Sequence, residues 1–139
     1  MSLVHLHPML VHFPIALALV AFLFNLVSYL LKKEWLNTGS VVLTALATLG
    51  AIASVLSGFL FTKPVAGLAA TMKETHLMYA VASTILLLLA SLAGYMWLSK
   101  KGAKSNWAYT YTFLLLLAAI GISLTGMEGG SIVYDVWLF

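Results

Sequence analysis

Long runs of hydrophobic residues alternate with short polar segments along this chain. Four stretches contain no charged residue, namely 13–31, 35–62, 77–99 and 105–127. Each is about as long as, or longer than, the roughly 20 residues with which a helix crosses a bilayer. The segments between them are too short to form a soluble domain. The pattern predicts an all-α membrane protein, with a single domain over 1–139 that forms an up-down-up-down bundle of four transmembrane helices. The predicted spans are about 9–31, 38–61, 76–99 and 106–126.

Composition supports a membrane protein and excludes several kinds of site. The chain is 63% hydrophobic and 8% charged, whereas soluble domains average roughly 25% charged residues. It has no cysteine, which excludes disulfides, iron–sulfur clusters, thiolate zinc sites and covalently attached haem. The few lysines are dispersed, so we expect the lipid bilayer as a partner and no nucleic acid.

The lysines predict how the bundle is oriented. Five of the seven follow the first and third spans: Lys32, Lys33, Lys100, Lys101 and Lys104. The positive-inside rule assigns that side to the cytoplasm. Both termini and all four histidines then lie on the outer, periplasmic side.

Histidines gather at the outer ends of two predicted spans. At about 1.5 Å of rise per residue, His12 lies roughly 30 Å from Lys32, and His76 lies roughly 36 Å from Lys100. The two imidazoles are therefore expected at similar depth, near the outer rim of the hydrocarbon. The pair that faces across the bundle is His12 with His76, or His7 with His76.

Two imidazoles on facing helices of a four-helix bundle can bind opposite sides of one porphyrin. We therefore expect b-type haem, with Lys63 and Lys73 at the polar edge that its propionates would occupy. A haem with both axial positions filled transfers single electrons. This favours an electron-transfer or metal-binding protein over an enzyme, with a periplasmic or membrane redox partner.

Copper or zinc is the competing chemistry at the same place. Five of the six methionines fall on the outer side: Met1, Met9, Met72, Met78 and Met127. Thioether with imidazole suits Cu(I). Zinc would take His7, His12 and His76 with Glu128 or water. A third alternative is a non-catalytic structural or partner-binding membrane subunit, and a homo-oligomer is also open.

Small and polar residues inside the spans predict packing. Gly50, Ser54 and Gly58 form a stripe at i, i+4 and i+8 of the second span, which permits close approach of a neighbouring helix. Asn25 is the most polar side chain at depth, and we expect it to form hydrogen bonds between helices. No charged group or histidine lies in mid-membrane, which disfavours a pump or secondary transporter.

The carboxy-terminal segment GMEGGSIVYDVWLF begins at residue 126. Its glycines, Gly126, Gly129 and Gly130, predict the end of the fourth helix. The remainder is too short to span again, so we expect it to fold back on the outer face.

Three features of the chain resemble a known family. They are HPMLVHFPIAL at residues 7–17, a lone His76 at the start of the third span, and GGSIVY at 129–134. The whole chain is similar to the bacterial membrane family called domain of unknown function 2231. The resemblance implies that His7, His12, His76 and the tail are shared positions, although DVWLF departs from the usual ending. Relatives joined to Rieske or c-type cytochrome domains imply redox work on the outer face of the bacterial inner membrane.

Overall fold

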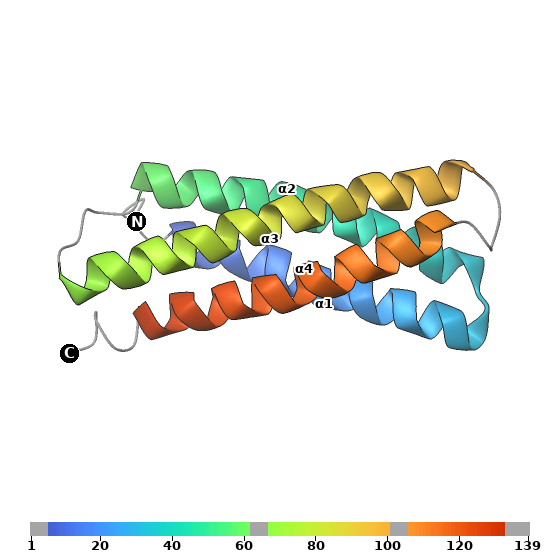
Figure 1. Ribbon diagram of the computed structural model, residues 1–139, viewed down its shortest axis with the longest axis horizontal. Coiled ribbons are helices and arrows are strands. Elements are labelled where there is room, and N and C mark those ends of the chain that lie inside the picture. Colours follow the sequence, from blue (N-terminus) through green and yellow to red (C-terminus); the bar gives the residue numbers. More distant parts are fainter. Residues whose placement is uncertain (1–5, 62–66, 101–105, 133–139) are drawn as a thin grey trace.

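The computed structural model describes residues 6–61, 67–100 and 106–132, and within these ranges the chain forms four α-helices. They are α1 (Leu6–Leu31), α2 (Glu34–Phe61), α3 (Leu68–Ser99) and α4 (Asn106–Ser131). The helices alternate in direction and lie alongside one another, with the start of α1 and the end of α4 at the same end of the bundle (Figure 1). The predicted all-α, four-helix fold is confirmed.

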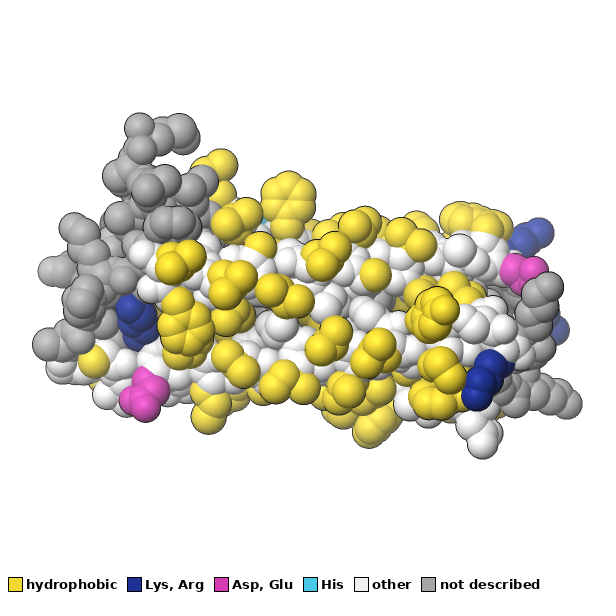
Figure 2. All heavy atoms as spheres, turned by 90° about the horizontal axis from the view of Figure 1, so that it is seen from above, with side chains coloured by type: hydrophobic (Ala, Val, Ile, Leu, Met, Phe, Trp, Pro, Cys, Tyr) yellow, Lys and Arg dark blue, Asp and Glu magenta, His cyan; other side chains and the backbone are white. Residues whose placement is uncertain are grey.

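The outer surface of the bundle is apolar along its length. All four helices are long and hydrophobic enough to cross a membrane, and large side chains such as Phe13, Leu30 and Phe113 are exposed. On the face shown in Figure 2, hydrophobic side chains cover the length of the bundle, and the Lys, Asp and Glu side chains lie near its two ends. Such a surface is stable in lipid, whereas in water it would be an aggregation site.

Two helices begin before the predicted positions. The first span was expected to start at about residue 9, but α1 starts at Leu6. The third span was expected to start at His76, but α3 starts at Leu68. The first turns of α3 contain Ala, Met, Lys and Glu, which all favour helix. The limit of an uncharged stretch therefore marks where the hydrocarbon of the membrane ends and not where the helix ends.

The fourth helix runs further than its glycines predicted. It continues through Gly126, Gly129 and Gly130 to Ser131, and none of these glycines has a positive φ. The prediction that they end the helix is wrong because two of them serve helix packing. A Cβ on Gly126 would lie 3.0 Å from Ile15 Cδ1, and one on Gly129 would lie 3.1 Å from His76 Cε1. Residues 133–139, the predicted outer segment, lie outside the described residues.

The helices pack as two hairpins. Contacts are densest between α1 and α2 and between α3 and α4, and sparser between α2 and α3 and between α1 and α4. Lys32 adopts a left-handed φ of 51° at the tight α1–α2 connection. The predicted glycine stripe is confirmed as a packing surface, since a Cβ on Gly50 would lie 3.3 Å from the Pro14 ring.

The interior of the bundle has three layers. A middle layer is apolar and mostly alanine, and consists of Ala18, Ala47, Ala51, Leu87, Ala118 and Ile122. On the side of the α1–α2 connection, Ser40, Thr44 and Tyr111 form a buried hydroxyl cluster. On the opposite side lie His7 and His76. Asn25 was expected to bond between helices, but neither atom of its buried amide has a partner, so this prediction is wrong.

Candidate cofactor site at the histidine end of the bundle

Two histidines from different hairpins meet at one end of the bundle. His7 lies in the first turn of α1, and His76 lies in α3, two turns after its start. The centres of their rings are 6.4 Å apart, and the ring planes cross at 89°. Both side chains are half-buried. The long-range pairing of these two imidazoles is the central feature of the site.

Hydrogen bonding fixes which nitrogen of the neutral His7 ring carries the proton. His7 Nδ1 lies 2.8 Å from Ser57 Oγ. The Ser57 hydroxyl already donates its proton to the Ser54 carbonyl at 2.8 Å. His7 Nδ1–H must therefore be the donor to Ser57, because a hydroxyl has a single proton to give. The lone pair of the neutral ring is then on Nε2.

His76 is held in the same tautomer by a different partner. Its Nδ1 lies 3.0 Å from the Thr125 carbonyl oxygen, which can only accept. The neutral His76 ring therefore also carries its proton on Nδ1 and its lone pair on Nε2. Donation from Nδ1 to a carbonyl or another oxygen acceptor is how proteins commonly orient histidines whose second nitrogen binds a metal.

A helical glycine lies beneath each imidazole. A Cβ on Gly58 would lie 3.2 Å from His7 Cε1, and a Cβ on Gly129 would lie 3.1 Å from His76 Cε1. These separations are tighter than ordinary side-chain contacts, so each ring lies almost directly on the backbone of the neighbouring helix. Glycine at both positions lets α2 and α4 support the rings at this distance.

The two hairpins repeat one arrangement. In α2, Gly50, Ser54 and Gly58 follow each other at intervals of four residues, and in α4 the corresponding residues are Gly121, Thr125 and Gly129. Seven residues after each histidine, Pro14 contacts Gly50 and Ser83 contacts Gly121. The polar partners differ, since His7 Nδ1 bonds to the Ser57 hydroxyl and His76 Nδ1 bonds to the Thr125 carbonyl. The two halves of the site are therefore alike in their glycine stripes and in the glycine beneath each ring.

Sequence reasoning did not select Ser57, Gly58, Thr125 or Gly129 as part of the site. Gly58 was assigned to packing and Gly129 to a helix end. The signal that could have found them is the repeat itself, which pairs each histidine with a glycine stripe in the following helix. Neither half contains a sequence motif that indicates a ligand when it is considered alone.

Two of the predicted charged residues, Lys73 and Glu128, lie near the histidine pair. Lys73 interacts electrostatically with His7, and Glu128 with His76. Both side chains are half-buried. Lys63, the other predicted cation, lies outside the described residues. The described part of the site therefore has one positive and one negative group beside its two imidazoles.

The structure distinguishes between the two histidines of α1. The sequence left His7 and His12 as alternative partners for His76, and His7 is the one that meets it. The His12 side chain is exposed, and its Nδ1 lies 2.6 Å from the Pro8 carbonyl of its own helix. Among the described residues, no group of three or more His, Cys, Asp or Glu side chains is placed to hold a metal ion.

Comparison with known proteins places the chain in a family. A family model described as "Predicted membrane protein (DUF2231)" matches residues 4–138. The chain belongs to this family. No curated protein sequence and no solved structure gives a significant match. The family assignment agrees with the resemblance in the sequence and with a multi-pass membrane protein.

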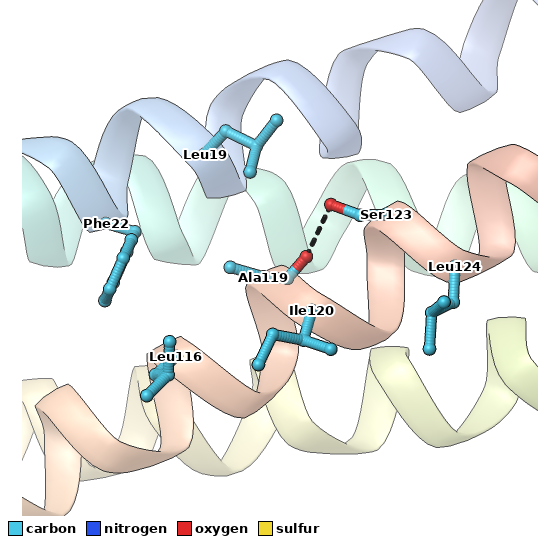
Figure 3. Close-up of a pocket in the computed structure, with 7 residues that line it drawn as sticks. All are labelled: Leu19, Phe22, Leu116, Ala119, Ile120, Ser123 and Leu124. Atoms are coloured by element: carbon cyan, nitrogen blue, oxygen red, sulfur yellow. Dashed lines mark hydrogen bonds between the residues drawn. The ribbon is translucent and has the colours of Figure 1, made fainter.

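A second concave region of this family member lies on its lipid-facing side. It is a groove between α1 and α4 lined by Leu19, Phe22, Leu116, Ala119, Ile120, Ser123 and Leu124 (Figure 3). Its one hydroxyl, on Ser123, donates to the Ala119 carbonyl at 2.7 Å. The groove offers no free polar group to orient a substrate, and its surface suits a lipid acyl chain.

Proposed function

We propose that this protein binds b-type haem between His7 and His76 and transfers single electrons at the outer end of the bundle. The supporting observation is the pair of crossed imidazoles, with ring centres 6.4 Å apart, whose Nδ1 atoms are both engaged within their own hairpins. The Nε2 lone pairs are then the groups available for a ligand.

The spacing of the rings fits a metal bound from both sides. Imidazole nitrogen binds such metals at about 2.0 Å, so one ion bonded to two opposed rings separates their centres by roughly 6 Å. The distance between the centres of His7 and His76 is 6.4 Å. The distance between the ring centres is thus close to the separation that one shared metal ion requires.

The number of ligands favours haem over a bare metal ion. A structural zinc site needs four protein ligands, and a catalytic zinc site needs three, whereas the described residues offer no such group. A porphyrin supplies four nitrogens itself, so two imidazoles complete the iron. Copper is less favoured because three of the four described outer-side methionines, Met9, Met78 and Met127, are exposed, with 59%, 61% and 70% of their surface accessible, and only Met72 is half-buried.

The residues around the pair would have distinct roles. Ser57 and the Thr125 carbonyl orient the rings, and Gly58 and Gly129 give them room. Lys73 would offset negative charge, such as that of propionates, at the polar edge. His7 and His76 would hold the haem, which would supply one-electron transfer and leave no site for substrate at the metal. The proposal therefore includes a periplasmic or membrane redox partner and no enzymatic step at the site.

The absorption spectrum of the purified protein tests this function. Protein produced with ample haem should be red, with the Soret band of six-coordinate iron. His7→Ala and His76→Ala should each weaken haem binding by more than the roughly 10–100-fold that loss of an outer-shell partner costs. His12→Ala is the matched control and should bind as the native protein does.

Three results would contradict the haem proposal. One is colourless native protein, and another is a His12→Ala defect as large as that of His76→Ala. The third is stoichiometric copper or zinc in elemental analysis that is absent from the His7→Ala and His76→Ala variants. That result would show that the pair binds a bare metal ion. Absence of both haem and metal would leave a structural or partner-binding role.

A further inference from the structure

Asn25 is a buried amide without a hydrogen-bond partner inside the bundle. None of its surface is exposed, and neither Oδ1 nor Nδ2 has a partner in the structure. Ala21 and Ser28, on the same face of α1, are also buried. This face points to the bundle interior, so the amide does too. Buried polar groups are nearly always paired, and an orphan amide indicates something that completes it.

The hydroxyl cluster lies beside this amide. Ser40 Oγ donates to the Ala21 carbonyl at 2.7 Å. In an α-helix the same carbonyl accepts the backbone N–H of Asn25, four residues later. Ser40 is therefore next to the Asn25 backbone. Tyr111 Oη lies 2.6 Å from Ser40 Oγ and 2.9 Å from Thr44 Oγ1, which brings the phenol to the same level of the bundle.

The three hydroxyls of the cluster have fewer protons to donate than they have hydrogen-bonding contacts. The Ser40 hydroxyl donates to the Ala21 carbonyl, and the Thr44 hydroxyl donates to the Ser40 carbonyl at 2.9 Å. Tyr111 can donate its one proton to Ser40 or to Thr44, but not to both. One short oxygen–oxygen contact therefore lacks a proton in this arrangement. The hydroxyl oxygens can each accept a further hydrogen bond, so a donor bound beside the cluster would find an acceptor there.

We propose that water is bound at the Asn25 amide, on the side of the hydroxyl cluster of Ser40, Thr44 and Tyr111. The occupant must accept from Nδ2 and donate to Oδ1, and it can also donate to a hydroxyl oxygen of the cluster. Water does all three. A cation would leave the amide N–H groups unpaired, and an anion would leave Oδ1 and the hydroxyl oxygens unpaired. This site is separate from the histidine pair and does not depend on the function proposed for it.

Water would enter from the end of the bundle that carries the α1–α2 connection. Asn25 is seven residues from Lys32, which is about 10 Å of helix. The half-buried Asn37, on α2, also has an unpartnered side-chain oxygen. Phe24 packs on Gly39, so the two asparagines lie at similar height in the hairpin. The alanine-rich middle layer separates this site from the histidine pair.

Two measurements on the purified native protein test the site. A structure at a resolution that shows ordered water should contain water within hydrogen-bonding distance of the Asn25 amide. Brief X-ray irradiation, which forms hydroxyl radicals from bound water, should oxidise Tyr111 although its side chain is fully buried. An amide paired directly with protein atoms, an empty site, or an occupant other than water would overturn the proposal, and so would unlabelled Tyr111.

Asn25→Leu, which replaces the amide by an apolar side chain with the same branching, provides the matching variant. It should abolish the labelling of Tyr111, whereas Asn106→Leu, at an exposed position at the start of α4, should leave it unchanged.

Discussion

At the scale of single residues, the positions of the two imidazoles depend on what lies beneath them. A Cβ on Gly58 would lie 3.2 Å from the His7 ring, and a Cβ on Gly129 would lie 3.1 Å from the His76 ring. The hydroxyl of Ser57 and the carbonyl of Thr125 then select the Nδ1–H tautomer. The histidines are the candidate ligands, but their orientation is set by these glycines and hydrogen-bond partners, which are not ligands themselves.

Substitution of adjacent glycines in α4 tests this dependence. Gly129→Ala should displace the His76 ring by a few tenths of an ångström and weaken haem binding by about 10–100-fold, the usual cost of losing support for a ligand. Gly130→Ala is the control, because nothing lies within 4 Å of the Cβ it would add. Soret titration of both proteins compares them. Equal haem affinity for the two variants would show that the glycine does not position the ring.

The control also carries an expectation about stability. Alanine is favoured over glycine in a helix by about 0.8–1.0 kcal/mol, so Gly130→Ala should stabilise the protein by up to that amount. Gly129→Ala should gain less, because its methyl group meets the His76 ring. A larger gain for Gly129→Ala, measured by unfolding, would contradict the contact seen in the structure.

At the scale of helices, small residues set how closely the hairpins pack. Gly94 of α3 faces α2 and α4 together: a Cβ there would lie 2.9 Å from Val41 Cγ2 and 3.1 Å from the Tyr111 ring. Tyr111 is held by Ser40 and Thr44 and packs on Trp97, with ring centres 5.6 Å apart. The phenol has little freedom to move away, so α3 itself would have to shift.

Gly94→Ala should therefore destabilise the bundle by about 1–3 kcal/mol, as overpacking of a tight core does. Gly39→Ala is the matched comparison, because its Cβ would meet only the Phe24 ring, at 3.1 Å, and this side chain is half-buried and can rotate. Equilibrium unfolding in mixed micelles, followed by tryptophan fluorescence, measures both variants. A loss for Gly39→Ala as large as that for Gly94→Ala would contradict this explanation.

At the scale of the whole molecule, charge distinguishes the two ends of the bundle. Lys32, Lys33 and Lys100 lie at the end with the α1–α2 connection, and Lys100 Nζ lies 5.7 Å from the centre of the Trp107 ring. The histidine pair is at the other end. By the positive-inside rule, this distribution supports our proposal that the histidines and their redox partner lie on the periplasmic side.

Single cysteines test this orientation, because the chain contains none. Thr71→Cys, at an exposed position near His76, should react with a membrane-impermeant maleimide in intact cells. Lys33→Cys should react only after the membrane is opened. The reverse pattern would assign the histidine pair to the cytoplasm and exclude a periplasmic redox partner.

The sequence by itself determined the membrane class, the four helices and the end at which the histidines gather. These follow from the length of the uncharged runs and the position of the lysines. Both patterns depend on whether each residue meets lipid or water, and not on which residues it contacts in the fold. It also predicted that the stripe containing Gly50 and Gly58 packs closely. Helix ends were less well predicted. Gly126 and Gly129 allow close contacts with α1 and α3, and the helix continues through them although glycine locally disfavours helix.

Only the tertiary structure decided which histidines meet and which polar groups are left alone. His7 and His12 are close in sequence, and the sequence left both as alternative partners of His76. The rotation of α1 in the bundle instead points His12 outward and His7 across the axis. Asn25 was expected to find a partner on another helix, yet it faces the interior without one. Both outcomes depend on packing between hairpins, which brings together residues far apart in the chain.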